Sequence, residues 1–519
     1  MEYPEVPVRT INELLDHGEK EFGSLYLFRW QEKDDIRSVT YAEFAKEVRA
    51  LSAYFAGNTS RDAHIAVLGS NSYAWLLGWF GAVCAGRLAV PLDPQLPTAD
   101  LLGLLEKSDT ELLLYADDFD DVAQAFPHAT MRLEDLPAAG DAEGWPCEVQ
   151  PDDIGMIVFT SGTTGKPKGV MLSHWNFLSN ALAAYRFGAK HLEFSGPGHV
   201  CVCVLPFYHT ASLNCSLISL MPMGSTMCLN AGLKTILKDF EIFQPDCIFL
   251  VPLLAEGIYK RIWDTAKKEG KDKLLRVMLR VSDFLFKLGI DLRRRLFKTV
   301  LNTFGGKMRW MLTGAAPISD ECVAGFYRFG IDVLHSCGAT ECSPGISLCR
   351  FRRDFIKPGS VGQILDCQEV RIVDGEIQVK GDNVFKSYYK DEEATREAFT
   401  EDGWYKTADL GHIDEDGFLY MTGRIKNLIV LGNGKNVSPE PLEQKLTDIP
   451  YIKEALVYDA GGEIAAELFL DEEVPDAAER LEGDLLELNR QLPVFQRITK
   501  TTLRDTEFPK TTTKKIKRK

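Results

Sequence analysis

The amino-acid sequence predicts an α/β protein, with mainly parallel sheets covered by helices in a large N-terminal part and a smaller α+β part after it. Three observations predict this class. Short apolar runs alternate with amphipathic helical patterns over most of the chain. After about residue 360 the runs pair as hairpins with Asp-Gly turns. The length of 519 residues and the apolar fraction of 45% suffice for several hydrophobic cores.

Alternating strand-like and helix-like segments make up the first part. The strand-like runs cover residues 64–69, 88–93, 201–206, 225–230, 247–252, 308–314 and 331–336. The helical patterns between them cover residues 71–86, 233–243 and 319–329. Strands separated by helices form parallel sheets, because a parallel connection needs a crossover that a helix supplies.

The last part of the chain shows a different pattern of predicted secondary structure. Residues 370–381 and 412–424 read as hairpins. After them come a strand at 428–432, a helix near 439–447 and a strand over 454–460. The final segment, from Pro509, is basic and expected to be irregular.

Composition excludes several classes of protein. The net charge is −16, from 59 Lys+Arg against 75 Asp+Glu, so a nucleic-acid partner is not expected. The twelve cysteines form no CxxC pair, which excludes a thiolate zinc site and favours reduced thiols in the cytoplasm. The N-terminal stretch lacks the apolar region of a signal peptide. No apolar run reaches the ~20 residues that a spanning helix needs.

The strongest candidate site is the segment 159–169, FTSGTTGKPKG, which follows an apolar run. Small residues let backbone N–H groups turn inward around an anion, and hydroxyls and lysines add donors. The segment therefore predicts a polyphosphate site; a flexible surface loop is the alternative. It is not a P-loop, because only two residues separate Gly162 from Gly165. The candidate ligand-binding residues are Thr160, Ser161, Gly162, Thr163, Thr164, Gly165 and Lys168.

This segment resembles the signature of the adenylate-forming superfamily, which includes acyl-CoA synthetases, peptide-synthetase adenylation domains and luciferases. The resemblance covers essentially the whole chain, because further motifs follow in the family order. It implies an N-terminal domain over 1–424 with a small β-barrel-like subdomain, and a mobile C-terminal domain over 425–519 with its hinge at Lys426. It also implies two steps. A carboxylate attacks the α-phosphate of ATP to give acyl-AMP and pyrophosphate, and a thiol, usually that of coenzyme A, then displaces AMP.

The resemblance assigns nucleotide contacts to two further motifs. The turn Gly314, Ala315, Ala316 would lie against adenine. In the motif that ends at Glu341, Gly338 precedes Thr340, which would bond the α-phosphate. Glu341, with Thr163, would hold Mg²⁺, because a carboxylate facing a phosphate needs a cation between them. Cys337 stands where the family usually stacks an aromatic ring, a change that costs on the order of 1 kcal/mol of binding.

Three motifs near the C-terminal end complete the resemblance. Asp409 would accept the ribose hydroxyls, with Ala408 in place of the usual glycine, and Arg424 would bond ribose and phosphates. The loop with Lys435 would move in for the thioester step. The catalytic lysine would be Lys515. Its neighbour, Lys514, replaces the family's glycine.

Two segments bear on the substrate. His209 lies in an aromatic-His pair that in the family borders the acyl carboxylate, which makes it a candidate gate; a core or surface role is the alternative. Residues 257–309 resemble a helical segment of long-chain acyl-CoA synthetases and carry 15 Lys+Arg against five Asp+Glu. A basic amphipathic helix is typical of membrane-surface contact, and the alternative is a helical pair with a solvated basic face.

Together these motifs favour an ATP-dependent ligase that joins a long- or medium-chain fatty acid to coenzyme A, with ATP, Mg²⁺ and coenzyme A as cofactors. Two alternatives remain open: a fatty acyl-AMP ligase that loads an acyl-carrier protein, and a nucleotide-binding protein without catalysis. The sequence leaves monomer and homodimer equally open.

Overall fold

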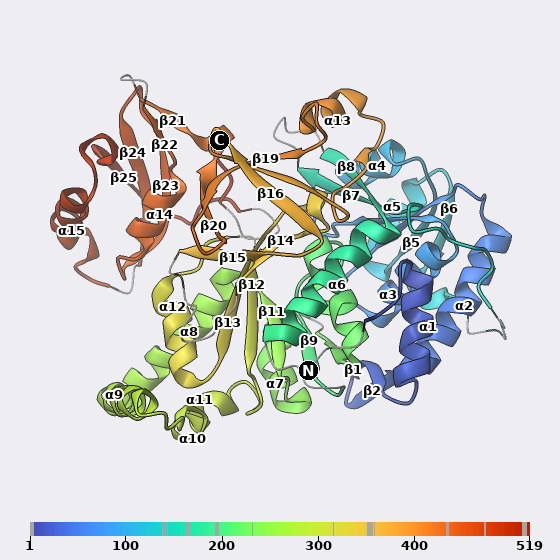
Figure 1. Cartoon of the computed structure of the whole chain (residues 1–519), viewed down its shortest axis with the longest axis horizontal. Helices are drawn as coiled ribbons and strands as arrows, with labels where there is room; N and C mark the ends of the chain where they lie inside the picture. Colours follow the sequence, from blue (N-terminus) through green and yellow to red (C-terminus); the bar gives the residue numbers. More distant parts are fainter. Residues whose placement is uncertain are drawn as a thin grey trace.

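The computed structural model describes the chain from residue 5 to residue 518 except residues 138–139, 141, 143, 162–166, 192–196, 231, 315, 350–356, 358, 432–434, 472–473 and 511–515. Two large mixed sheets with helices around them form the main body, and a smaller unit packs at one end (Figure 1). This architecture confirms the predicted α/β class with a large N-terminal part and a small C-terminal part.

The larger sheet contains 13 strands among the described residues. Its order is β16 (Gln368–Val373), β17 (Glu376–Gly381), β19 (Tyr405–Ile413), β20 (Phe418–Arg424), β15 (Ser360–Ile364), β14 (Gly345–Leu348), β13 (Asp332–Gly338), β12 (Trp310–Gly314), β11 (Cys247–Leu250), β9 (Val200–Cys203), β10 (Thr226–Leu229), β1 (Tyr26–Glu32) and β2 (Asp35–Thr40). From β13 to β1 all neighbours are parallel.

The smaller sheet contains seven strands in the described part of the chain. Its order is β18 (Ser387–Tyr388), β8 (Pro167–Ser173), β7 (Ile154–Ser161), β4 (Leu88–Leu92), β3 (His64–Leu68), β5 (Thr110–Tyr115) and β6 (Ala129–Arg132). The strands from β7 to β6 are parallel, and β3, β4 and β5 are buried along most of their length, which explains their continuous apolar runs.

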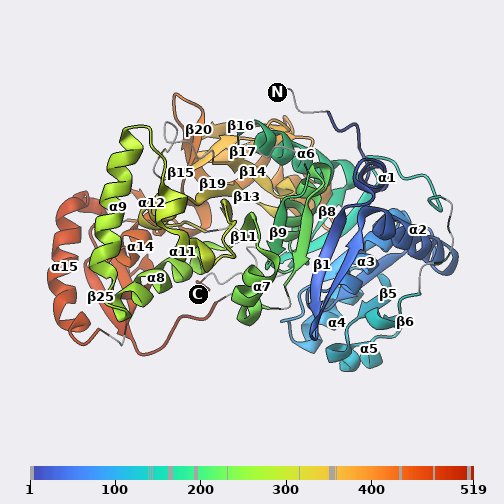
Figure 2. The ribbon, with the colours of Figure 1, turned by 90° about the horizontal axis from the view of Figure 1, so that it is seen from below.

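Helices cover and separate these sheets (Figure 2). The helices of the main body are α1 (Ile11–Phe22), α2 (Tyr41–Asn58), α3 (Tyr73–Cys84), α4 (Thr98–Lys107), α5 (Asp120–Ala125), α6 (His174–His191), α7 (Ile236–Phe243), α8 (Pro252–Lys268), α9 (Asp272–Lys287), α10 (Arg293–Leu296), α11 (Lys298–Asn302), α12 (Asp320–Phe329) and α13 (Glu392–Ala398). Capping side chains start several of them: Thr10 with Glu13 forms a capping box at α1, and Ser319 caps α12.

The strands after β13 lie in the part of the chain where a barrel-like subdomain is expected. They are antiparallel to their neighbours and continue the edge of the large sheet. Among the described residues no ladder closes them into a barrel. The hairpins expected at 370–381 and 412–424 are β16–β17 and β19–β20, so the local prediction is confirmed.

The C-terminal unit has its own small hydrophobic core. It comprises β21 (Ile429–Val430), β22 (Asn436–Val437), α14 (Glu440–Thr447), β23 (Ile452–Asp459), β24 (Ile464–Leu470), α15 (Ala477–Gln491) and β25 (Lys500–Arg504). Leu446, Val457 and Leu468 are fully buried in that core. None of the helices in the described residues combines the length and the apolarity needed to cross a membrane.

Candidate active site

A single cleft of about 3240 Å³ lies between the main body and the C-terminal unit. Its walls come from the β7–β8 hairpin, the loops after β9, β11, β12 and β13, the β19–β20 pair, α8 and α14. In parallel sheets such loops meet at the carboxyl edge, which is where α/β proteins bind ligands. The predicted site residues in its lining are Thr160, Lys168, His209, Gly314, Ala316, Cys337, Gly338, Thr340, Glu341, Asp409 and Arg424.

Other predicted residues are not in this lining. Gly162, Thr163, Thr164, Gly165, Ala315 and Lys515 lie outside the described residues, as does the side chain of Ser161. Lys435 is described but does not line the cleft, and its Nζ lies 4.3 Å from the centre of the Phe495 ring.

The β7–β8 hairpin brings the two ends of the glycine-rich segment together. Thr160 pairs with Lys168, and Phe159 pairs with Gly169. A Cβ on Gly169 would lie 2.9 Å from the Ile157 side chain, so glycine is needed there for the strands to pack. The Lys168 ammonium lies 4.8 Å from the centre of the Tyr388 ring. The hairpin therefore holds one positive charge at the cleft.

The carboxyl ends of β12 and β13 pack closely on each other. Gly314 pairs with Ser336, whose Oγ would lie 2.7 Å from a Cβ on Gly314. That hydroxyl donates a 3.0 Å hydrogen bond to the carbonyl of Thr313. A Cβ on Gly338 would lie 2.2 Å from the Pro344 carbonyl oxygen. Both positions therefore favour glycine, because a side chain would clash with the Ser336 hydroxyl at Gly314 and with the Pro344 carbonyl at Gly338.

Glu341 is held at the cleft by a tyrosine that sequence reasoning missed. The Tyr388 hydroxyl donates a 2.9 Å hydrogen bond to Glu341 Oε1. Burial raises the pKa of Glu341, while the hydrogen bond from Tyr388 and the charge of Lys168 oppose that rise. A carboxylate supported in this way beside a cation is a suitable ligand for a divalent ion. No local pattern marks Tyr388, because it lies 47 residues from Glu341 in the chain.

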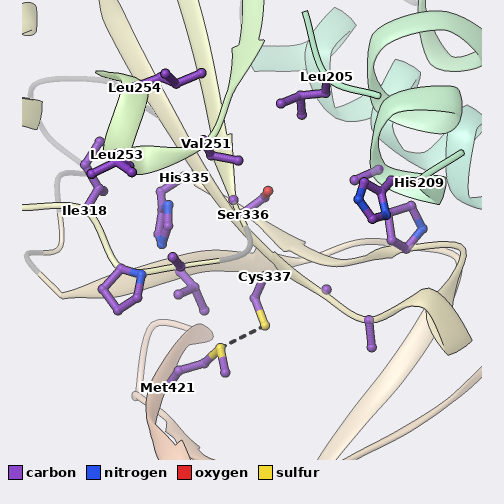
Figure 3. A pocket seen from close by; sticks show the side chains of 18 of the residues that line it. Leu205, His209, Val251, Leu253, Leu254, Ile318, His335, Ser336, Cys337 and Met421 are labelled. Carbon is purple, nitrogen blue, oxygen red and sulfur yellow. Dashed lines mark hydrogen bonds between the residues drawn. The ribbon is translucent and has the colours of Figure 1, made fainter. Parts of the chain in front are cut away.

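At Cys337 the cleft wall is formed by two sulfur-containing side chains rather than by an aromatic ring. Cys337 Sγ lies 3.0 Å from Met421 Sδ, which reaches in from β20 (Figure 3). In the same view His209 and His335 lie on opposite sides, with Ser336 and Cys337 between them. Burial lowers the pKa of His335 to about 4, so this imidazole is neutral near pH 7. No local pattern in the sequence marks Met421, and its polarisable thioether adds a soft apolar surface to this wall.

Asp409 and Arg424 form a pair across β19 and β20. They are register partners, and Arg424 Nε lies 3.0 Å from Asp409 Oδ1. The Asp409 side chain is 8% exposed and that of Arg424 is 40% exposed, so the carboxylate is the anchored member. The pair presents an acceptor and a donor side by side at the cleft.

Ala408, beside this pair, adopts a left-handed backbone with φ of +57°. An alanine in this region is strained by about 1–2 kcal/mol, which accounts for the glycine usual in the family.

We expect Ala408→Gly to stabilise the protein by about 0.5–1 kcal/mol, because relief of strain exceeds the added entropy of the unfolded chain. Urea titration measures the change. Ala465→Gly, in the regular strand β24, is the matched control and should destabilise; equal losses in both variants would contradict the strain argument.

In the segment that carries Lys515, the described residues that follow this lysine reach the cleft. Lys510 bridges to Ile516, and the Lys517 amide donates a 2.8 Å hydrogen bond to the Pro509 carbonyl. Ile516, Lys517 and Arg518 line the cleft. Arg518 Nη2 lies 2.5 Å from Glu443 Oε2 on α14, which ties this end of the chain to the C-terminal unit.

A second contact joins the C-terminal unit to the main body. Lys260 Nζ on α8 lies 3.0 Å from Oδ2 of Asp471, and Lys453 Nζ lies 2.9 Å from its Oδ1. Asp471 is 6% exposed, so this carboxylate is buried between two lysines from different parts of the chain. Sequence reasoning did not find it, since the partners are 211 residues apart.

An apolar branch of about 40 Å³ continues from the cleft into the large sheet. The lining that it shares with the cleft consists of Ala184, Cys215, Ser219, Phe249, Leu312 and Leu348. Deeper in, Cys201, Met223 and Cys247 close it. The lining of the branch is mainly apolar, so it suits a short hydrocarbon segment rather than a polar group.

Comparison with known proteins agrees with this arrangement. Residues 21–389 match the model of the AMP-binding enzyme family, and residues 426–519 match the model of the AMP-binding enzyme C-terminal domain. The chain is 29% identical to long-chain-fatty-acid–CoA ligase FadD15 of Mycobacterium bovis, over 84% of this chain and 78% of that protein. It is 30% identical to human long-chain-fatty-acid–CoA ligase 1, over 60% of this chain and 46% of that protein.

Two solved structures share the fold over nearly the whole chain. O-succinylbenzoate coenzyme A synthetase of Bacillus subtilis in complex with AMP has a TM-score of 0.76 at 24% identity, over 97% of this chain and 96% of that one. ATP-bound MatB of Rhodopseudomonas palustris has a TM-score of 0.77 at 23% identity, with the same coverage. The cleft, the order of its motifs and the match over residues 21–389 lead to one conclusion: the chain belongs to the AMP-binding enzyme family.

Proposed function

We propose that the protein is an acyl-CoA synthetase that activates a long- or medium-chain fatty acid. The fatty acid carboxylate attacks the α-phosphate of ATP, acyl-AMP forms and pyrophosphate leaves. The thiol of coenzyme A then attacks the acyl carbonyl, a thioester forms and AMP leaves. The observation that carries the proposal is that one cleft joins the phosphate-type hairpin, Glu341 and the Asp409–Arg424 pair to an apolar branch.

Each wall of the cleft has a role in the first step. The 160–168 hairpin, with Thr160 to Gly165 and Lys168, surrounds the phosphates; Thr340 bonds the α-phosphate. The motif of Gly314, Ala315 and Ala316, with Cys337 and Gly338, accepts the adenine. Asp409 accepts hydrogen bonds from the ribose hydroxyls, and Arg424 neutralises phosphate charge. Lys515 stabilises the charge that develops on the α-phosphate.

Glu341 and Thr163 are the proposed Mg²⁺ ligands. Mg²⁺ is usually held by one or two protein oxygens together with substrate phosphates, and it neutralises their charge. Glu341 fits this role, because Tyr388 orients its carboxylate at the cleft. Among the described residues no three His, Cys, Asp or Glu side chains converge as a metal cage. The hydrogen bond from the Tyr388 hydroxyl opposes the rise in the Glu341 pKa that burial causes, and so favours the ionised form that binds a cation.

The acyl chain extends along the cleft toward the apolar branch, and His209 in the cleft lining is the proposed gate. His209 lines the same cleft, and its ring lies 4.4 Å from that of Tyr208, centre to centre. The branch ends at Met223 and a pair of buried cysteines, so a hydrocarbon chain would meet only apolar or weakly polar groups there.

We assign residues 1–424 to an N-terminal domain and 425–519 to a C-terminal domain that rotates about Lys426 between the two steps. Burial and the nearby Arg424 charge lower the pKa of Lys426. A short 3-10 turn over Ile425–Asn427 leads out of β20, which is a suitable place for a change in backbone dihedrals. The loop with Lys435 would reach the cleft only after this rotation, for the thioester step.

The Lys260–Asp471 contact should favour the orientation that places Ile516–Arg518 at the cleft. We expect Lys260→Met to slow adenylation by up to about fivefold, because the Lys260 ammonium is largely exposed and Asp471 keeps Lys453, so the lost pair contributes about 1 kcal/mol. The thioester step from preformed acyl-AMP should not slow. Asp471 keeps Lys453, so the fold is preserved. Arg261→Met, one residue along α8, is the control, and an equal effect in both variants would refute the role of the contact.

A pyrophosphate-release screen over fatty acids of two to eighteen carbons and aryl acids tests the proposal. Release that rises with chain length, followed by thioester formation with coenzyme A, is the expected result. Acyl transfer to a carrier protein alone would indicate an acyl-AMP ligase. ATP binding without pyrophosphate release from any acid would indicate a non-catalytic homologue.

A further inference from the structure

Helix α9 carries a row of exposed apolar side chains that the active site does not use. The members of this row, called the outer stripe below, are Leu274 (57% exposed), Val277 (53%), Val281 (48%), Phe284 (62%) and Leu288 (61%). Their spacing alternates between three and four residues, which places them along one side of a helix. An apolar row of this length on an outer helix is a mark of an interaction site.

The other side of α9 is packed against the main body, so the helix is fixed while the stripe faces outward. Leu275 and Leu279 are buried in the core beneath it. Asp283 accepts a 2.6 Å hydrogen bond from Arg328 of α12. In both views α9 lies at the periphery, outside α8 and α12 (Figures 1 and 2). The stripe is therefore not a misplaced part of the core.

A row of cations runs beside the outer stripe. Lys273, Arg280 and Lys287 follow one another at seven-residue intervals and are exposed. Within the described residues, none of the three has an acidic side chain at ion-pair distance. The segment 257–309 carries 15 Lys+Arg and five Asp+Glu in a chain of net charge −16. The positive charge is thus concentrated where the apolar side chains are exposed.

We propose that the outer stripe of α9 docks on an anionic lipid membrane surface. Apolar side chains would enter the boundary between headgroups and acyl chains, while Lys273, Arg280 and Lys287 attract anionic headgroups. This binding needs no fatty acid and no ATP, so it stands independently of the proposed activity.

A second copy of the chain is a less favourable occupant. Two stripes packed on each other antiparallel would place the cation rows of both copies next to each other, and like charges at such spacing are destabilising. The positive charge of the helix therefore attracts anionic lipid and repels the same helix of a second copy.

Co-sedimentation of the full-length protein with vesicles at low salt tests the inference. Vesicles of phosphatidylcholine with phosphatidylglycerol should bind the protein, and pure phosphatidylcholine should bind it at least about tenfold more weakly. High salt should release it. Val281→Gln with Phe284→Gln should reduce the partition coefficient about tenfold, and Lys273→Glu with Arg280→Glu and Lys287→Glu about a hundredfold.

Matched variants on other surfaces control for net charge and for general apolarity. Lys190→Glu with Lys234→Glu and Lys238→Glu makes the same charge change, and Leu486→Gln with Val494→Gln removes other exposed apolar groups. Both controls should retain binding. Equal losses in the control variants, or no binding to anionic vesicles by the parent protein, would overturn the proposal. So would a dimer that the α9 variants dissociate without any vesicle binding.

Discussion

Lys515→Ala is expected to slow adenylation about 10²–10³-fold, which is the loss typical of one preorganised charge at a transition state. The described neighbours of this residue, Ile516 to Arg518, line the cleft. Because the lysine serves the first step, preformed acyl-AMP should still react with coenzyme A at nearly the parent rate. Rapid-quench measurement of acyl-AMP formation and of thioester formation separates the two steps.

Lys514 and Lys517 are natural controls for Lys515, since both neighbour it in a basic tail. Lys514→Ala and Lys517→Ala should each change adenylation by less than about tenfold, if only one lysine acts on the α-phosphate. Equal loss of both half-reactions in Lys515→Ala would contradict its assignment to adenylation. A large effect in Lys514→Ala instead would move the role by one residue.

Glu341→Gln should reduce adenylation about 10²-fold or more at low Mg²⁺, because the amide keeps the shape of the side chain and removes its charge. The variant can still accept the hydrogen bond from Tyr388, so its fold should be intact. The measurement is pyrophosphate release as a function of Mg²⁺ concentration. An unchanged Mg²⁺ dependence would show that Glu341 does not bind the metal.

Tyr388→Phe tests the role of Glu341 by a milder change, because the carboxylate itself is kept. It removes the hydrogen bond that stabilises the Glu341 carboxylate, so the pKa of Glu341 should rise further. Activity requires the ionised form, and the acidic limb of the pH profile should therefore move to higher pH. The Mg²⁺ requirement should increase about tenfold, as is usual when the support of a metal ligand is lost. Loss of stability without a shift of the pH profile would mean that Tyr388 serves only packing.

Contiguous segments were predictable from sequence because their chemistry depends on neighbouring residues. The glycine-rich segment 159–169 needs small residues at fixed spacing, and the structure places its two described ends as paired strands. The predicted strand over 201–206 is longer than β9, which ends at Cys203. Apolar residues before a proline also occur where a strand has left its sheet, so an apolar run alone overestimates the length of the strand.

The amino-acid sequence by itself determined the family, the order of the motifs and the residue types at the cleft, since each of these is encoded locally. Only the tertiary structure decided which groups meet. Tyr388 reaches Glu341, Met421 replaces the missing ring beside Cys337, and Lys260 reaches Asp471. The physical reason is that such contacts depend on how helices and strands far apart in the chain pack together. The same holds for α9: its sequence shows apolar and basic residues together, and packing alone separates the buried face from the outer stripe.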